Sequence, residues 1–270
     1  GHIWKFVTLA YIPPTIAGVV LAYRKKYLLG GVITALFIAL QIQSNHIQMS
    51  YYFMFVILFF IIAYFVDAYE KKELPHFFKA SAILALAAVV GVCVNISNLY
   101  HTYEYSKETM RGKSELKQEG PAANQTSSGL DRDYITNWSY GIGETLTLLV
   151  PNVKGGGCST TLSQNETAMA KANPMYGNLY SQLTPYFGDQ PWTAGPVYVG
   201  AFVVFLFILG CFIVKGPLKW ALLGATIFSI LLSWGKNFMG LTDFFIDYIP
   251  MYNKFRAVSS ILVIAEFTIP

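Results

Sequence analysis

Six long apolar segments limit what this chain can fold into. They cover residues 6–23, 27–43, 51–68, 77–96, 195–214 and 218–234, and a seventh begins at residue 261. A membrane-spanning helix needs about 20 mainly apolar residues, because the hydrocarbon core is about 30 Å thick and a helix rises about 1.5 Å per residue. Charged residues make up only 13% of the chain, against about 25% in soluble domains. We therefore expect an all-α, polytopic transmembrane helix bundle of about seven spans, and not a soluble enzyme.

The basic residues predict how the spans are oriented. They cluster at residues 24–26, 71–79 and 215–219, in alternate connections between the apolar segments. Because lysine and arginine in short loops resist translocation, we place these connections in the cytoplasm. The chain then divides into spans one to four (1–98), an extracytoplasmic loop (99–192) and spans five to seven (193–270). The net charge of +4 is not gathered on an arginine-rich face, so we expect no nucleic-acid partner.

Within the long loop, the sequence changes from polar to aromatic. Residues 102–133 are rich in Lys, Glu, Gln, Ser and Gly and predict a solvated segment, whereas residues 134–150 are aromatic and apolar. Leu146, Leu149 and Val150 recur at helical spacing. We expect a short helix over residues 143–150 that lies at the membrane surface and packs against the outer ends of the spans.

Three polar residues occupy the short outer turn between the second and third segments: Asn45, His46 and Gln48. The turn has no glycine or proline, so we expect these side chains on continued helical ends. They would bind a phosphate or orient a sugar hydroxyl. The alternative is that they end the helices and hydrogen-bond free backbone groups, as polar residues between spans must.

Two isolated acidic residues lie in aromatic parts of the long loop. Glu144 is flanked by glycines that permit close backbone approach. A carboxylate near an apolar surface has a raised pKa and acts as a general base or a metal ligand, so a divalent metal stays open as a cofactor. The alternative is a carboxylate at the start of a helix, favoured by the helix dipole.

Asp189 lies between Tyr186 and Trp192. Aromatic faces beside an acid suit a sugar, because the C–H faces stack and the hydroxyls donate hydrogen bonds. The alternative is an aspartate that forms a turn.

Lys254 and Arg256 stand on the predicted outer side, immediately before the seventh segment. Cations on this side run against the orientation rule. A lipid-linked phosphate would explain them, since arginine offers two parallel donors to phosphate oxygens, and ordinary anionic headgroups are the alternative. If the chain between them is extended, both cations converge on one pocket, near His46 or Asn45. Glu266, inside the seventh segment, is an intramembrane ionisable residue and hence a functional candidate.

Several of these motifs carry a resemblance to a known family. They are Asn45-His-Ile-Gln-Met-Ser-Tyr-Tyr, Trp138-Ser-Tyr-Gly with Glu144 and Leu149-Val-Pro-Asn, Gly188-Asp-Gln-Pro with Gly195-Pro-Val-Tyr, and Asn253-Lys-Phe-Arg-Ala-Val-Ser. They resemble the YfhO family of bacterial membrane proteins, above all its Bacteroidetes-type members, over nearly the whole chain apart from residues 102–133. That family is similar to the GT-C superfamily of membrane glycosyltransferases, which take a sugar from a polyprenyl-phosphate carrier and transfer it on the outer face.

The resemblance implies a function and a location. It implies a multi-pass protein of the bacterial inner (cytoplasmic) membrane that contacts membrane lipid. The protein would move a sugar from a polyprenyl-phosphate donor to a cell-envelope glycan or glycolipid acceptor, by displacement at the anomeric carbon. Glu144, Asp189 and His46 would form the catalytic and acceptor site, and Lys254, Arg256, Asn45 and Gln48 would bind the carrier phosphate.

The start and end of the sequence predict an interior piece of a longer protein. The chain begins with Gly-His-Ile-Trp, without methionine, and the last apolar run stops at Pro270. In GT-C enzymes the catalytic acid commonly lies in the first outer loop, which would precede Gly1. Two other classes stay open. One is a transporter or flippase for a lipid-linked sugar, favoured by Pro13-Pro14 and Glu266; the other is a non-catalytic scaffold subunit with the long loop as its docking surface.

Overall fold

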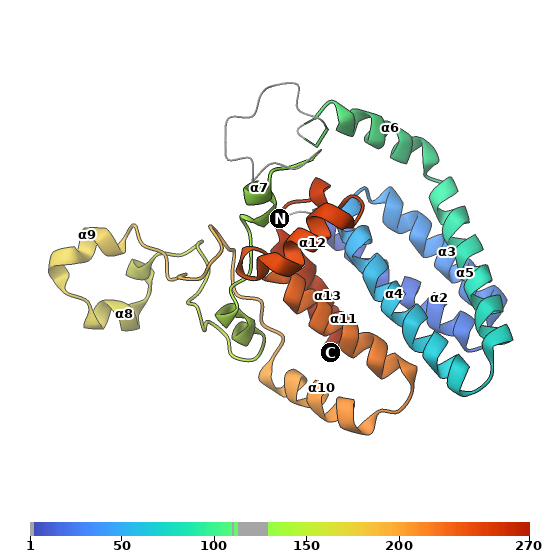
Figure 1. Cartoon of the computed structure of the whole chain (residues 1–270). Helices are drawn as coiled ribbons and strands as arrows, with labels where there is room; N and C mark the ends of the chain where they lie inside the picture. Colours follow the sequence, from blue (N-terminus) through green and yellow to red (C-terminus); the bar gives the residue numbers. More distant parts are fainter. Residues whose placement is uncertain (1–2, 110, 113–128) are drawn as a thin grey trace. The chain divides into compact units, whose positions relative to one another are not determined.

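The computed structural model describes residues 3–109, 111–112 and 129–270, and the regular structure in these ranges is entirely helical (Figure 1). The predicted all-α class is therefore confirmed. The chain folds as two compact units. The first comprises Gly1–Glu115 and Cys211–Ile227, and the second comprises Leu116–Gly210 and Phe228–Pro270. Half of the predicted solvated segment, residues 113–128, lies outside the described residues.

The first unit is built from helices joined by tight turns. Before residue 110 they are α1 (Ile3–Ala10), α2 (Ile12–Tyr23), α3 (Tyr27–Gln43), α4 (Ile47–Glu70), α5 (Leu74–Cys93) and α6 (Ile96–Lys107). α1 and α2 follow each other directly and are separated only by a turn at Tyr11, because Pro13 and Pro14 in the first turn of α2 have no N–H to donate. Left-handed backbone at Lys25, Asn45 and Lys72 (φ 67°, 58° and 58°) reverses the chain after α2, α3 and α4, so α2 to α5 run antiparallel.

Glycines let the helices of the first unit pack closely. α2, α3 and α5 lie side by side in Figure 1. A Cβ atom on Gly18 would lie 2.5 Å from Oγ1 of Thr34, and one on Gly30 would lie 2.5 Å from the backbone nitrogen of Ala22. α2 and α3 therefore touch through their backbones. Membrane helices commonly pack in this way, because lipid gives no hydrophobic driving force between helices and close contact replaces it.

Among the described residues, three helices are long and apolar enough to cross a membrane: Ile3–Tyr23, Ile47–Glu70 and Leu74–Cys93. The pair Pro217–Ser233 and Gly235–Tyr248 makes a fourth if its 106° bend lies within one span. By contrast, α3 has 17 residues and α10 (Ala201–Ile213) has 13. At about 1.5 Å per residue they reach only about 26 and 20 Å. The described chain thus holds three to four candidate spans, and a total of seven stays a prediction.

Large apolar side chains point outward from these helices. Leu58 and Ile62 on α4, Leu86 on α5, and Phe202 and Phe212 on α10 are all about half exposed or more. Soluble monomers rarely expose contiguous apolar surface on this scale, whereas hydrocarbon would cover it without cost. The exposed apolar faces and the helix lengths together indicate a membrane protein.

The second unit consists of short helices and loops around a small core. Short 3₁₀ helices are labelled η. The elements are α7 (Arg132–Thr136), η2 (Gly143–Leu148), η3 (Leu162–Gln164), α8 (Glu166–Lys171), η4 (Pro174–Tyr176), α9 (Gly177–Tyr180), most of α10, the end of α11 (Pro217–Ser233), η5 (Gly235–Phe238), α12 (Met239–Tyr248), η6 (Tyr252–Lys254), η7 (Val258–Leu262) and α13 (Val263–Thr268). The core joins Tyr140 and Leu148 to Leu262, Ala265 and Ile269. The segment around η2 is thus anchored on the C-terminal helix.

The helix expected over residues 143–150 is present as η2, a 3₁₀ helix that ends at Leu148. Residues three apart share one face of a 3₁₀ helix, and here Glu144 and Thr147 form the buried face. The apolar residues of the predicted helix are partly exposed: Leu146, Leu149 and Val150 are 57%, 38% and 50% exposed. Leu148 of η2 packs in the core with Leu262 and Ala265 of the C-terminal elements, and the position of this helix at a membrane surface stays a prediction.

Candidate functional site

Glu144 is a buried carboxylate held by hydrogen bonds from neutral donors. Its side chain is buried on the inner face of η2, with 3% of the residue exposed. Oε2 accepts a hydrogen bond from the backbone N–H of Gly141 at 2.6 Å, and Oε1 accepts one from the phenol of Tyr186 at 2.5 Å. The backbone N–H of Asp189 donates to Oε2 at 3.4 Å. Both oxygens of the buried acid are thus satisfied from within the loops.

Two glycines make this arrangement possible. A Cβ atom on Gly141 would lie 2.6 Å from Oδ2 of Asp189 and 2.9 Å from Oε2 of Glu144. A Cβ atom on Gly188 would overlap Oε1 of Glu144. The carboxyl groups of Glu144 and Asp189 therefore crowd the same stretch of backbone. The prediction that glycines near Glu144 permit close approach is confirmed.

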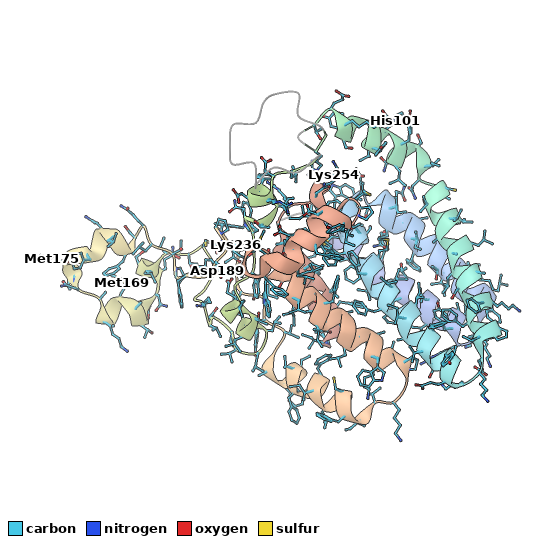
Figure 2. The ribbon with its side chains drawn as sticks, viewed as in Figure 1. His101, Met169, Met175, Asp189, Lys236 and Lys254 are labelled. Atoms are coloured by element: carbon cyan, nitrogen blue, oxygen red, sulfur yellow. The ribbon has the colours of Figure 1, made fainter. Side chains whose placement is uncertain are left out.

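Asp189 is the exposed acid of the pair, and residues of η5 hold it in place. Oδ2 accepts a hydrogen bond from Nδ2 of Asn237 at 3.1 Å, and the same nitrogen donates to the carbonyl of Tyr140 at 3.0 Å. The ammonium of Lys236 donates to the backbone carbonyl of Asp189 at 3.1 Å, and the two residues lie next to each other in Figure 2. An accessible carboxylate and an accessible ammonium thus share one edge of the unit.

The phenols beside Glu144 are kept protonated. Burial, reinforced by the negative charge of Glu144, raises the pKa of Tyr140 to about 12. Burial and the hydrogen bond to Glu144 also raise the pKa of Tyr186 far above its ordinary value. Tyr186 can therefore act as a permanent donor to Glu144, while its oxygen accepts from the N–H of Gln190 at 2.9 Å.

The space next to Glu144 is too small for a substrate. Tyr140, Glu144, Lys154 and Tyr186 border a cavity of only about 10 Å³. A cavity needs a volume of about 10–15 Å³ to hold a single water molecule. Glu144 is therefore closed to a substrate and can only position the loop that carries Asp189. Asp189 itself is exposed and accessible to a ligand. Among the described residues, no group of three His, Cys, Asp or Glu side chains is placed to hold a metal ion.

Arg256 lies against aromatic side chains near the end of α7. Its Nη1 donates to the phenol of Tyr134 at 2.7 Å, and its guanidinium lies 5.6 Å from the centre of that ring and 6.0 Å from the ring of Trp138. Lys254 is half-buried, and desolvation lowers its pKa. The extended chain expected between the two cations is present only in part, because Lys254 ends the turn η6 while Phe255 has extended angles (φ −108°, ψ 149°).

The polar turn at residues 44–46 belongs to the first unit. Asn45 adopts left-handed backbone, and His46 is the residue before α4. Gln48 lies inside α4 and donates to the phenol of Tyr52 at 2.9 Å. We expected all three side chains on continued helical ends. Only Gln48 lies within a helix, because the chain reverses at Asn45 and α4 begins after His46. The predicted convergence of His46 or Asn45 with Lys254 and Arg256 stays a prediction.

The sequence prediction missed Lys236, Asn237 and the part played by Tyr186. Lys236 did carry a signal, because it follows the sixth apolar segment on the predicted outer side, where a lysine is as unusual as Lys254. Asn237 and Tyr186 gave no comparable signal, since their partners lie about 50 and 40 residues away along the chain.

Fold and site together define an all-helical membrane-type protein with a carboxylate site built from loops of its second unit. Comparisons with family models, with curated proteins and with solved structures find no match to this chain. The resemblance to the YfhO family stays a prediction.

Proposed function

We propose that the chain is part of an integral membrane glycosyltransferase that moves a sugar from a polyprenyl-phosphate carrier to a cell-envelope glycan or glycolipid. The observation that carries the proposal is Asp189: an exposed carboxylate, fixed by Asn237 and adjacent to Lys236. Phe187 and Trp192 flank it in the chain and are 67% and 54% exposed. Exposed aromatic faces beside a carboxylate suit a sugar, because its C–H faces stack while its hydroxyls donate hydrogen bonds.

In the proposed reaction, Asp189 is the general base. Its carboxylate takes the proton of an acceptor hydroxyl, whose oxygen attacks the anomeric carbon as the bond from that carbon to the phosphate oxygen breaks. The carrier phosphate leaves with the electron pair, and cations stabilise its charge. Lys254 and Arg256 are proposed to bind this phosphate, and Lys236 is the cation that touches Asp189.

Glu144 has a positioning role in this proposal. It holds the backbone of Asp189 and Gly141 while remaining closed to substrate. This differs from the catalytic role expected from the sequence, where Glu144 itself was a candidate base. The proposed chemistry uses residues of the second unit alone.

The proposed topology follows from the basic connections. Residues 24–26, 71–79 and 215–219 are placed in the cytoplasm, with the second unit's loop on the outer face of the bacterial cytoplasmic membrane. Lipid-linked sugars are then used on the side where the cell envelope is assembled.

A transporter of lipid-linked sugar is the second candidate, and one observation favours it. The pair Pro217–Ser233 and Gly235–Tyr248 is bent by 106° after Trp234. Transporters commonly build their binding sites at such broken helices. The bend lies directly beside Lys236 and Asn237, so the same site would serve either function.

An assay in liposomes separates the two functions. The protein is reconstituted with a polyprenyl-phosphate donor that carries a labelled sugar, and an envelope glycan is supplied outside. The proposal predicts a labelled glycan whose formation requires the protein. Movement of the label across the bilayer without a new glycosidic product would contradict the transferase and favour the transporter.

A further inference from the structure

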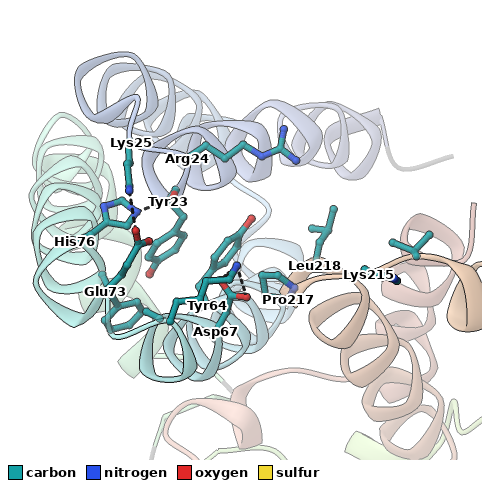
Figure 3. Close-up of a pocket in the computed structure, with 14 residues that line it drawn as sticks. Tyr23, Arg24, Lys25, Tyr64, Asp67, Glu73, His76, Lys215, Pro217 and Leu218 are labelled. Atoms are coloured by element: carbon teal, nitrogen blue, oxygen red, sulfur yellow. Dashed lines mark hydrogen bonds and ion pairs between the residues drawn. The ribbon is translucent and has the colours of Figure 1, made fainter.

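The first unit contains a second polar site, at the helix ends that carry the basic connections. A cavity of about 550 Å³ opens between the ends of α2 and α4, the start of α5 and the start of α11 (Figure 3). This volume falls in the range of about 300–1,000 Å³ that is typical of small-molecule sites. The cavity is independent of the carboxylate site and of the function proposed for it.

The charges around this cavity do not balance. Its walls include Arg24, Lys25, Lys71 and Lys215 as cations and Asp67 and Glu73 as anions. Lys25 pairs with Glu73 at 3.0 Å, and Lys71 pairs with Asp67 at 2.8 Å. Each carboxylate thus has its own lysine. Arg24, which also hydrogen-bonds the phenol of Tyr64, and Lys215 give the lining an excess of two positive charges. An anion is the ligand that this wall would attract.

The wall that carries Arg24 is rigid. The Tyr23 ring stacks on Tyr64 with centroids 4.5 Å apart and on Phe77 with centroids 5.6 Å apart. His76 fixes the end of α2, because its Nε2 lies 2.8 Å from the carbonyl oxygen of Tyr23 and its Nδ1 lies 2.6 Å from the phenol of Tyr27. A site of this kind needs little reordering when a ligand binds, so less binding free energy is lost to ordering.

The start of α11 adds to the positive potential. This helix has 17 residues and begins at Pro217, which lines the cavity together with Leu218. The first turn of a helix presents backbone N–H groups without partners in the helix and the positive end of its dipole. Lys215 precedes this turn by two residues.

We infer that the cavity binds a phosphate group, with Arg24 and Lys215 as its main ligands. A guanidinium and an ammonium are the side chains that proteins use most for phosphate oxygens. The apolar outer faces of α4 and α5 place lipid beside the cavity, and its basic turns would lie at the cytoplasmic surface. The phosphate is supplied either by an anionic lipid headgroup or by a free phosphate compound.

Calorimetric titration of the purified full chain in neutral detergent tests this site. Two probes are used: a short-chain phosphatidylglycerol and inorganic phosphate. The double variant Arg24→Gln/Lys215→Gln should weaken binding about 10-fold or more, since hydrogen bonds to charged groups are lost. Lys26→Gln/Lys72→Gln is the matched control, because it removes the same charge from neighbouring turns but from residues outside the cavity lining. It should weaken binding less than about 3-fold.

The outcomes separate the sources and can overturn the inference. Saturable binding of the lipid alone assigns the site to a headgroup, and binding of inorganic phosphate assigns it to phosphate as such. If neither probe binds saturably, or if both double variants weaken binding equally, the site does not exist as described. Should the Arg24→Gln/Lys215→Gln protein fail to fold, the single variants decide: each should weaken binding, and wild-type affinity in both contradicts the inference.

Discussion

The carboxylate of Glu144 accepts a hydrogen bond from the backbone N–H of Asp189, and this contact joins the buried acid of the second unit to its exposed one. The two residues are 45 positions apart in the chain. The same carboxylate also accepts from Gly141 and Tyr186, so it organises the loop that presents Asp189. We therefore expect the stability of this loop and the presentation of Asp189 to depend on Glu144.

Glu144→Gln should destabilise the protein by about 1–3 kcal/mol, because an amide N–H₂ would face donors that are now bonded to a carboxylate oxygen. Denaturant unfolding in detergent measures the effect. Glu166→Gln, at an exposed glutamate of α8, is the control and should leave the free energy of unfolding unchanged. Equal stability of the two variants would mean that the hydrogen bonds to Glu144 do not hold the loop.

Gly141→Ala should destabilise by about 1–3 kcal/mol, since the new methyl group would push apart the carboxyl groups of Asp189 and Glu144. Gly240→Ala is the matched control in α12, where an added Cβ meets nothing within 4 Å. There the substitution should stabilise by about 0.5–1 kcal/mol, because alanine favours a helix over glycine. Denaturant unfolding in detergent measures both changes. A stabilising Gly141→Ala would refute the close approach of the two acids.

Stability should fall as the pH rises above about 10, because the pKa of Tyr140 is raised from 10.0 to about 12 in the folded chain. Between these values the unfolded chain has lost the phenol proton that the folded chain keeps, so unfolding is favoured. The stability difference between wild type and Tyr140→Phe should therefore shrink from pH 9 towards pH 12, as measured by denaturant unfolding at each pH. Tyr176→Phe, at an exposed position, serves as the comparison. A difference that does not vary with pH would contradict the burial of this phenol.

The topology can be tested by labelling single cysteines from outside intact cells, after the native cysteines are replaced by serine. A cysteine at Met175, which is 81% exposed, should react with an impermeant maleimide. A cysteine at Lys72, in a predicted cytoplasmic turn, should react only after the membrane is permeabilised. Labelling of Lys72→Cys in intact cells would contradict the predicted orientation of all the spans.

Much of the first unit could be predicted from the sequence, because apolar composition decides whether a helix forms in lipid. The segment predicted over residues 51–68 lies within Ile47–Glu70. Composition does not decide where a helix begins. The apolar run that starts at Gly195 becomes helical only at Ala201, after Gly200 adopts φ 115°, and the resulting α10 is too short to count as a span.

The two acids of the site could be predicted from the sequence, but the way in which they are arranged could not. Glu144 and Asp189 could be picked out because a carboxylate in an apolar or aromatic sequence is suited to acid–base chemistry or to binding a sugar. Their hydrogen bonds join loops that are about 45 residues apart in the chain and come together only through tertiary packing. No periodic pattern in the sequence predicts such a contact. Burial also distinguishes the two acids, because Glu144 lies on the buried face of η2 whereas Asp189 lies exposed in its own loop.

The central claim, that Asp189 is the general base of sugar transfer, is tested most directly by the single-turnover rate from a labelled polyprenyl-phosphate donor. Asp189→Asn should lower this rate about 100-fold or more, since general base catalysis contributes about 10²–10⁴. Asp131→Asn, at another exposed aspartate of the second unit, should keep the wild-type rate. A wild-type rate in Asp189→Asn, with the fold intact, would contradict the claim.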